Sequence, residues 1–229
     1  MYKRISIYIG MILCISALLA FYIIELQGDS FFMVSLCLIV LVMILFFITV
    51  EKKMKLRDML ILAVMSGVSA VSRITFFFLP QCKPTAALVI ITGISLGPGA
   101  GFVCGMMSAF ISNFYFGQGI HTPFQMVAMG MLGFLAGIFF HNKKRNHKIV
   151  VTIFTGLSVC IIYGAIVDLS TIFLMSTKAN IEMAIVIYTA AIPMNLIHGV
   201  SSAIFIYFLY ESIRKRLNRV QVKYGLIGN

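Results

Sequence analysis

The sequence predicts an all-α integral membrane protein with eight spans, on two observations: its apolar content and the placement of its basic residues. Hydrophobic residues fill 61% of the 229 positions, charged residues only 11%, and the mean hydropathy is +1.03. A soluble domain of this length has no use for so much apolar surface. Most apolar runs approach the roughly 20 residues that cross about 30 Å of hydrocarbon as a helix. These runs are 5–24, 31–50, 59–79, 85–96, 100–116, 123–140, 149–175 and 183–210.

The basic residues predict how the helices are oriented. Of the 18 Lys and Arg residues, 15 fall in four clusters. The clusters lie at 3–4, 52–57, 143–148 and 214–223. Cytoplasmic loops carry such an excess of Lys and Arg, so we expect all four clusters and both termini on the cytoplasmic side of the cell membrane. The net charge of +11 then reflects orientation against the lipid bilayer, and we expect no nucleic-acid partner.

Three parts follow one another along the chain. Residues 1–50 predict an N-terminal transmembrane hairpin of two spans with few polar interruptions. The first span lacks the small-x-small cleavage site of a signal peptide, so we expect it to be retained. Residues 58–213 predict a six-helix core, and 214–229 a basic cytoplasmic tail. Because an even number of crossings must separate two cytoplasmic clusters, the short run 85–96 is expected to be a span of its own.

Polar and aromatic residues gather in what this orientation makes the outer half of the core. A charged group inside a bilayer is costly unless it is paired or hydrated, so such residues mark functional sites by default. We expect them to converge on one outward cavity that binds a small molecule, with the glycine-rich loop 117–122 as its lid. The candidates are Arg73, Phe77, Gln81, Lys83, Asn113, Phe116, Gln118, His121, Gln125, Asp168, Asn195 and His198.

Structural explanations compete with this interpretation. Arg73 and Asp168 are equally compatible with an ion pair to each other that only stabilises the fold. Asn195 and His198 share a helix face at i, i+3, a spacing also typical of a packing hydrogen bond between helices. His121 and Lys83 are compatible with ordinary solvated loop positions, and the aromatic side chains with a belt at the membrane interface.

Small residues predict close helix packing. Ala63, Gly67 and Ala70 place a small-residue face on the first core helix, which suits docking of another helix from a partner or from this chain. The many glycines between 97 and 137 are better explained by packing inside the core.

The sequence lacks the signatures of enzymes and of ATP-driven motors. It contains no GxxxxGK[ST], no HExxH and no GxSxG. Its five cysteines are scattered, without metal-ligand spacing. We therefore expect no enzymatic activity, no catalytic residue, no cofactor and no metal. Uphill transport by this chain would need an ion gradient or a partner protein.

Four segments of the core carry a long, ordered set of motifs: RxxFFFLPQxKP at 73–84, ALVIIxGxxLG at 87–97, GFxxGxxSAFxSNF at 101–114 and FGQGxxTPxQM at 116–126. Together they resemble a known family, the membrane-embedded substrate-binding (S) components of energy-coupling factor (ECF) transporters. The resemblance covers about residues 58–210. It implies a six-helix fold, capture of a vitamin or related micronutrient from outside, and docking on a transmembrane coupling subunit driven by two ATPase subunits. It also implies that the face with Ala63, Gly67 and Ala70 contacts the coupling subunit.

The resemblance leaves the substrate open. The motifs are most similar to S components assigned to cobalamin or its precursors, and a flavin, another vitamin or a different small nutrient remain alternatives. His121 and Phe124 stand where the best-described relatives carry aromatic residues, and the hairpin 1–50 is absent from many of them. From the residues alone, a stand-alone proton-coupled secondary transporter, a membrane enzyme and a structural membrane protein are the rival classes.

Overall fold

The structure is a computed structural model that describes residues 56–119, 121–141, 147–175 and 181–224. The predicted hairpin 1–50 lies outside these residues. All regular structure in the described ranges is helical. The helices are α3 (Leu56–Thr75), α4 (Thr85–Leu96), α5 (Pro98–Phe116), α6 (His121–Phe140), α7 (Lys148–Ser158), the π-helical turn η1 (Val159–Tyr163), α8 (Gly164–Met175) and α9 (Ile181–Tyr224).

The described helices fit a multi-pass membrane protein. Four stretches are long and apolar enough to cross a bilayer: Pro98–Phe116, His121–Phe140, Lys148–Ile172 and Ile181–Lys223. The apolar parts of α3 and α4 are shorter. Helices α7 and α8 and the turn η1 between them are continuous and count as one helical segment. The described part of the chain then contains six helical segments, the number expected for the core. The count of eight spans also needs the hairpin, and stays a prediction.

Several boundaries differ from the sequence-based expectation. The first core helix ends at Thr75, because Phe76–Pro80 forms turns before the chain reaches α4. The last helix continues without a break through the basic segment to Tyr224, where a separate tail is expected from 214. The helix predicted over 123–140 begins two residues earlier as α6, at His121, so this residue belongs to a helix rather than to a loop.

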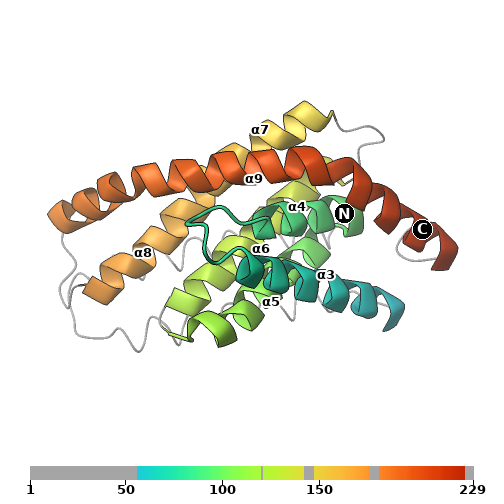
Figure 1. Cartoon of the computed structure of the whole chain (residues 1–229), viewed down its shortest axis with the longest axis horizontal. Coiled ribbons are helices and arrows are strands. Elements are labelled where there is room, and N and C mark those ends of the chain that lie inside the picture. The colour runs from blue at the N-terminus through green and yellow to red at the C-terminus, as the bar shows by residue number, and fades with distance from the viewer. Residues whose placement is uncertain (1–55, 120, 142–146, 176–180, 225–229) are drawn as a thin grey trace, which may run out of the picture.

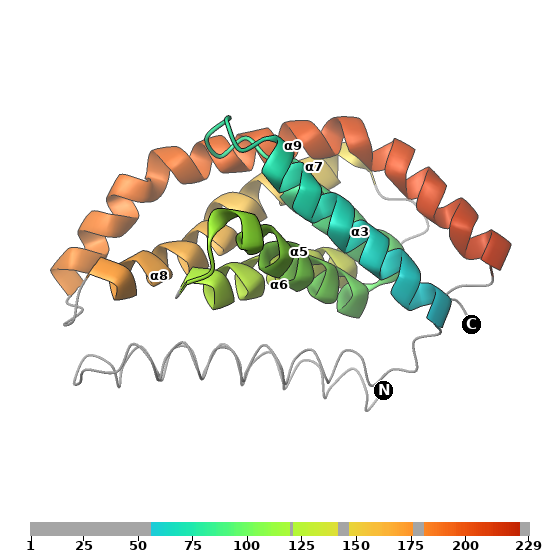
Figure 2. The same ribbon diagram turned by 60° about the horizontal axis from the view of Figure 1, so that its bottom comes forward.

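Helix α4 forms the centre of the bundle, and all of its residues are buried. It contacts α3, α5, α6 and α9. Figures 1 and 2 show α9 running the length of the molecule over the shorter helices, with α7 and α8 beside it and α3 crossing the bundle near α5. Apolar side chains on the outside, such as Val64, Val71 and Phe208, suit contact with lipid.

Glycines allow α4, α5 and α6 to approach backbone to backbone. A Cβ atom added to Gly133 would overlap the carbonyl group of Gly101, and one added to Gly105 would overlap that of Met129. Gly93 faces Gly133 in the same way. The expectation that these glycines serve packing is therefore met by the structure, and α5, held against α6 in this way, packs in turn against α3.

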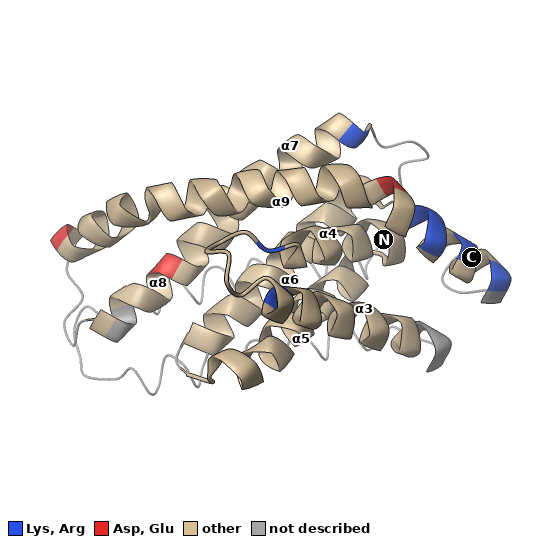
Figure 3. Ribbon diagram, viewed as in Figure 1, with Lys and Arg blue, Asp and Glu red and all other residues tan. Residues whose placement is uncertain are grey.

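Charged residues are sparse in the middle of this bundle. Figure 3 shows Lys and Arg gathered on the C-terminal part of α9, with further basic positions in α3 and in the loop before α4. The basic residue in the last turn of α3 is Arg73, and Lys83 stands in the loop. Arg73 is only 8% exposed, so the fold encloses a guanidinium group that needs polar partners.

Candidate functional site

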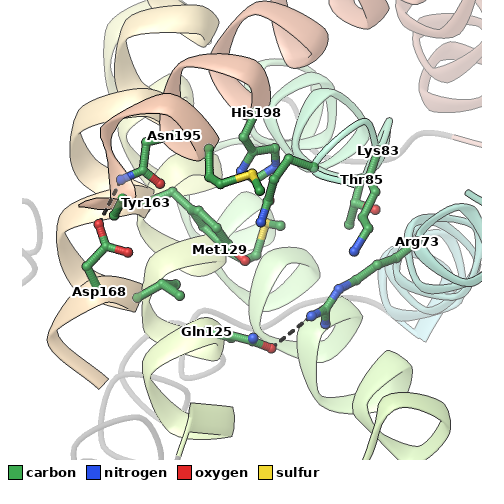
Figure 4. Close-up of a pocket in the computed structure, with 13 residues that line it drawn as sticks. Arg73, Lys83, Thr85, Gln125, Met129, Tyr163, Asp168, Asn195 and His198 are labelled. Atoms are coloured by element: carbon green, nitrogen blue, oxygen red, sulfur yellow. Dashed lines mark hydrogen bonds between the residues drawn. The ribbon is translucent and has the colours of Figure 1, made fainter. Parts of the chain in front are cut away.

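A cavity of about 230 Å³ opens between α3 and α6 on one side and α8 and α9 on the other (Figure 4). The structure brings seven of the twelve candidate binding residues together along its wall. They are Arg73, Gln81, Lys83, Gln125, Asp168, Asn195 and His198. The rest of the lining is mostly apolar, and the pattern of the sequence did not single it out. It consists of Thr85, Met129, Tyr163, Val167, Ala191 and Met194.

Arg73 is held at one end of the cavity by neutral partners. Its Nη1 donates to Ser112 Oγ at 2.7 Å and to Asn113 Oδ1 at 2.8 Å, both on α5. Its Nη2 donates to Gln125 Oε1 on α6 at 3.0 Å. Asn113 is fully buried, and its Nδ2 donates to the same Gln125 oxygen and to Thr122 Oγ1. Three helices therefore fix the position of the guanidinium group.

Lys83 reaches the same end of the cavity from the loop between α3 and α4. Its ammonium lies 5.2 Å from the centroid of the Phe116 ring, and the Arg73 guanidinium lies 5.1 Å from that centroid. Burial, together with the positive charge of Arg73, lowers the pKa of Lys83 below its ordinary value. The loop is fixed on α9 by a hydrogen bond from Ser201 Oγ to the Gln81 carbonyl oxygen, at 3.0 Å. Gln81 has a φ of 58°, in the left-handed region.

Asp168 and Asn195 form the opposite wall. Asn195 Nδ2 on α9 donates to Asp168 Oδ2 on α8 at 2.7 Å. The side chain of Asn195 lies so close to Gly164 that a Cβ at that position would be 2.6 Å from Nδ2. Gly164 directly follows η1, and π-helical turns are frequent at functional sites. The turn also ends on Tyr163, whose ring packs edge-on against His198 at 4.8 Å between centroids.

The remaining five candidates do not line the cavity. Asn113 and Phe116 lie behind its wall and support Arg73 and Lys83. Phe77 is 57% exposed and packs against Tyr115. Gln118 is exposed and donates to the Phe110 carbonyl oxygen, and His121 begins α6. The expected lid, loop 117–122, is described except for residue 120, and none of its described residues lines the cavity. The loop before α4 contributes to the lining instead, with Gln81 and Lys83.

The hydrogen-bond partners bear on two of the competing structural explanations, those for Arg73 with Asp168 and for Asn195 with His198. Arg73 and Asp168 face the cavity from different walls, and each is bonded to other residues rather than to the other. Asn195 and His198 share a helix face, as the spacing predicts. Asn195 forms a hydrogen bond between helices of the kind expected, from α9 to Asp168 on α8, whereas His198 packs edge-on against Tyr163.

The three small residues of α3 differ in their exposure. Ala63 is exposed, and Gly67 is partly exposed with open space where a side chain would extend. Ala70 is fully buried in the core, because it lies on the neighbouring stripe of α3 with Ser66, which is buried as well. A docking surface can therefore include Ala63 and Gly67 but not Ala70.

An all-helical membrane bundle with a mixed polar and apolar cavity defines a membrane protein that binds a small molecule. A family model described as "ECF transporter, substrate-specific component" matches residues 57–210, more than half of the chain. The chain belongs to this family of ECF transporter S components, which are transporter subunits rather than enzymes. A comparison with curated proteins found no match, and neither did one with solved structures.

Proposed function

We propose that the chain is the high-affinity binding subunit through which an ECF-type importer takes up a vitamin or related micronutrient. The observation that carries this proposal is the cavity, because it lies within the residues that match the family and is lined by oriented polar groups between apolar walls. Cobalamin or a precursor is the first candidate substrate, since the motif segments between 73 and 126 resemble S components assigned to it.

The function is tested by purifying the chain with and without the subunits of an ECF module. We expect mass spectrometry to find one small organic molecule retained by the chain, and the coupling subunit and ATPases to co-purify with it. Uptake of that molecule into vesicles should require ATP and the whole complex. Uptake by the chain alone under a proton gradient would instead identify a secondary transporter and contradict the proposal.

We also propose a topology of eight spans with both termini in the cytoplasm, on the distribution of basic residues. In a cysteine-free background, single cysteines at Gly28, Gly119 and Ala179 are expected to react with an impermeant reagent added to intact cells. Cysteines at Asn142 and Asn218 should react only after the membrane is opened. Labelling at Asn142 in intact cells would overturn the orientation.

The coupling subunit is proposed to dock on the face of α3 that carries Ala63 and Gly67. The variant Gly67→Leu fills open space, so the isolated chain should fold and bind its substrate with nearly unchanged affinity. ATP-dependent uptake by the complex should be lost, because the bulky side chain prevents close helix approach. Ala190→Leu, on the exposed side of α9, is the matched control and should leave uptake intact. Equal loss of binding and uptake in Gly67→Leu would assign this residue to the fold instead.

A further inference from the structure

The cavity carries its positive charge at one end and its negative charge at the other. Arg73 and Lys83 lie together at the α3 end, each about 5 Å from the centroid of the Phe116 ring (5.1 Å and 5.2 Å). Asp168 lies on α8, across the cavity, as Figure 4 shows. Between them the wall is apolar or aromatic, with Met129, Val167 and Tyr163. A site of this kind distinguishes the two ends of a bound molecule.

The positive end has unused capacity for binding. A guanidinium group has five N–H donors, and Arg73 directs three of them to Ser112, Asn113 and Gln125. Its Nε–H and one hydrogen on Nη2 have no acceptor among the described residues. Lys83 makes neither a hydrogen bond nor an ion pair within the described ranges, apart from its contact with the Phe116 ring.

Two neighbouring cations without an anion are costly to bury. Desolvation and the neighbouring charge of Arg73 both oppose the charge of Lys83 and lower its pKa. A carboxylate or phosphate group placed between Arg73 and Lys83 would remove both costs and accept charge-assisted hydrogen bonds. The neutral partners behind Arg73 fix its position without neutralising it. This arrangement stabilises the fold poorly but prepares the site for an anion.

The negative end is set up for a hydrogen-bond donor. Asp168 Oδ2 accepts a hydrogen bond from Asn195, whereas Asp168 Oδ1 has no partner in the described part of the chain. Since Asn195 also fills the space above Gly164, it holds the carboxylate in a fixed orientation. A hydroxyl, amide or ammonium group of a ligand would satisfy the remaining oxygen.

We propose that the substrate of this site is an organic anion whose acid group binds between Arg73 and Lys83, with a hydrogen-bond donor directed at Asp168. The inference rests on the proposed function and specifies its substrate class. The acid group is either the carboxylate of a compact vitamin or the phosphate diester of cobalamin. In the second case most of the corrin ring lies outside the cavity, whose volume is about 230 Å³.

The test compares acidic compounds with their neutral counterparts on the purified full-length chain, by calorimetry or ligand-induced thermal stabilisation. The pairs are pantothenate with panthenol, nicotinate with nicotinamide, and cobalamin with cobinamide, which lacks the phosphate diester. In one pair the acid should bind at least about tenfold more tightly than its counterpart. The compound retained on purification is a further probe, and it should carry an acid group at neutral pH.

Two substitutions assign the preference to the proposed residues. Lys83→Met should weaken binding of the acid about tenfold or more and leave binding of its neutral counterpart unchanged. Lys148→Met is the matched control, because this lysine stacks on Tyr207 away from the cavity, and it should change neither affinity. Arg73→Lys keeps the charge and loses the planar fork, which makes it safer for folding than removal of the side chain. Arg73→Lys too should weaken binding of the acid and leave binding of the neutral counterpart unchanged.

The outcomes separate this inference from the proposed function. Equal affinity for acid and counterpart, a retained compound without an acid group, or an unaltered preference in Lys83→Met would each overturn the anion site. In all three cases the chain would still be a binding subunit. Failure to retain any compound, to bind any probe and to associate with an ECF module would overturn the proposed function and the anion site with it.

Discussion

Replacing Gly133 by valine is expected to prevent the helical core from assembling. The new Cβ would overlap the backbone of Gly101, and neither helix can move away without separating α6 from both α4 and α5. Overpacking against movable side chains typically costs about 1–3 kcal/mol, and the cost against backbone is expected to exceed that range. The variant should be lost from the membrane fraction or elute as an aggregate in detergent, with no cooperative thermal transition.

The control for this prediction is the same substitution at Gly67. This glycine also lies inside a helix, but nothing occupies the space into which a side chain would extend. Gly67→Val should therefore yield a folded chain whose thermal midpoint equals or exceeds that of the wild type, since valine is the better helix former. A wild-type midpoint for Gly133→Val would show that α5 and α6 are not packed as described.

Hydropathy predicted the helices of the core because burial in lipid requires long apolar helices whatever their partners are. The polar residues of the cavity could be predicted for a related reason. Arg73 and Asp168 stand out in segments where a charge is costly, so the sequence alone identifies them as functional candidates. Gln81 and Lys83 could be predicted because the orientation set by the basic clusters places their loop on the same outer side as Arg73.

The partners of these residues could not be predicted, because they depend on packing between distant segments. The pairing of Asp168 with Asn195 depends on the space left by Gly164, and nothing in the local pattern indicates it. Tyr163 reaches the cavity where the helix is π-helical, and this departure has no signature in the hydropathy. Ala70 shows the same limit, since a small-residue stripe does not reveal which of its members face the interior.

The variant Asn113→Asp is expected to have the largest effect on substrate binding. Asn113 Oδ1 already accepts a hydrogen bond from Arg73, so a carboxylate of the same shape would form an ion pair there. The hydroxyl of Thr122 can donate to the new oxygen, while Gln125 Oε1 keeps its hydrogen bond from Arg73 Nη2. The chain should fold, with Arg73 neutralised from behind and a negative charge next to the anion site.

Affinity for an acidic substrate should therefore fall by about two decades or more, whereas affinity for a neutral analogue should change little. Gln118→Glu is the matched control: it makes the same amide-to-carboxylate exchange at an exposed residue outside the cavity and should bind as the wild type does. Binding isotherms and thermal midpoints measured on all three proteins separate loss of affinity from loss of fold. A folded Asn113→Asp variant that holds the acid at wild-type affinity would show that Arg73 is not the group that receives it.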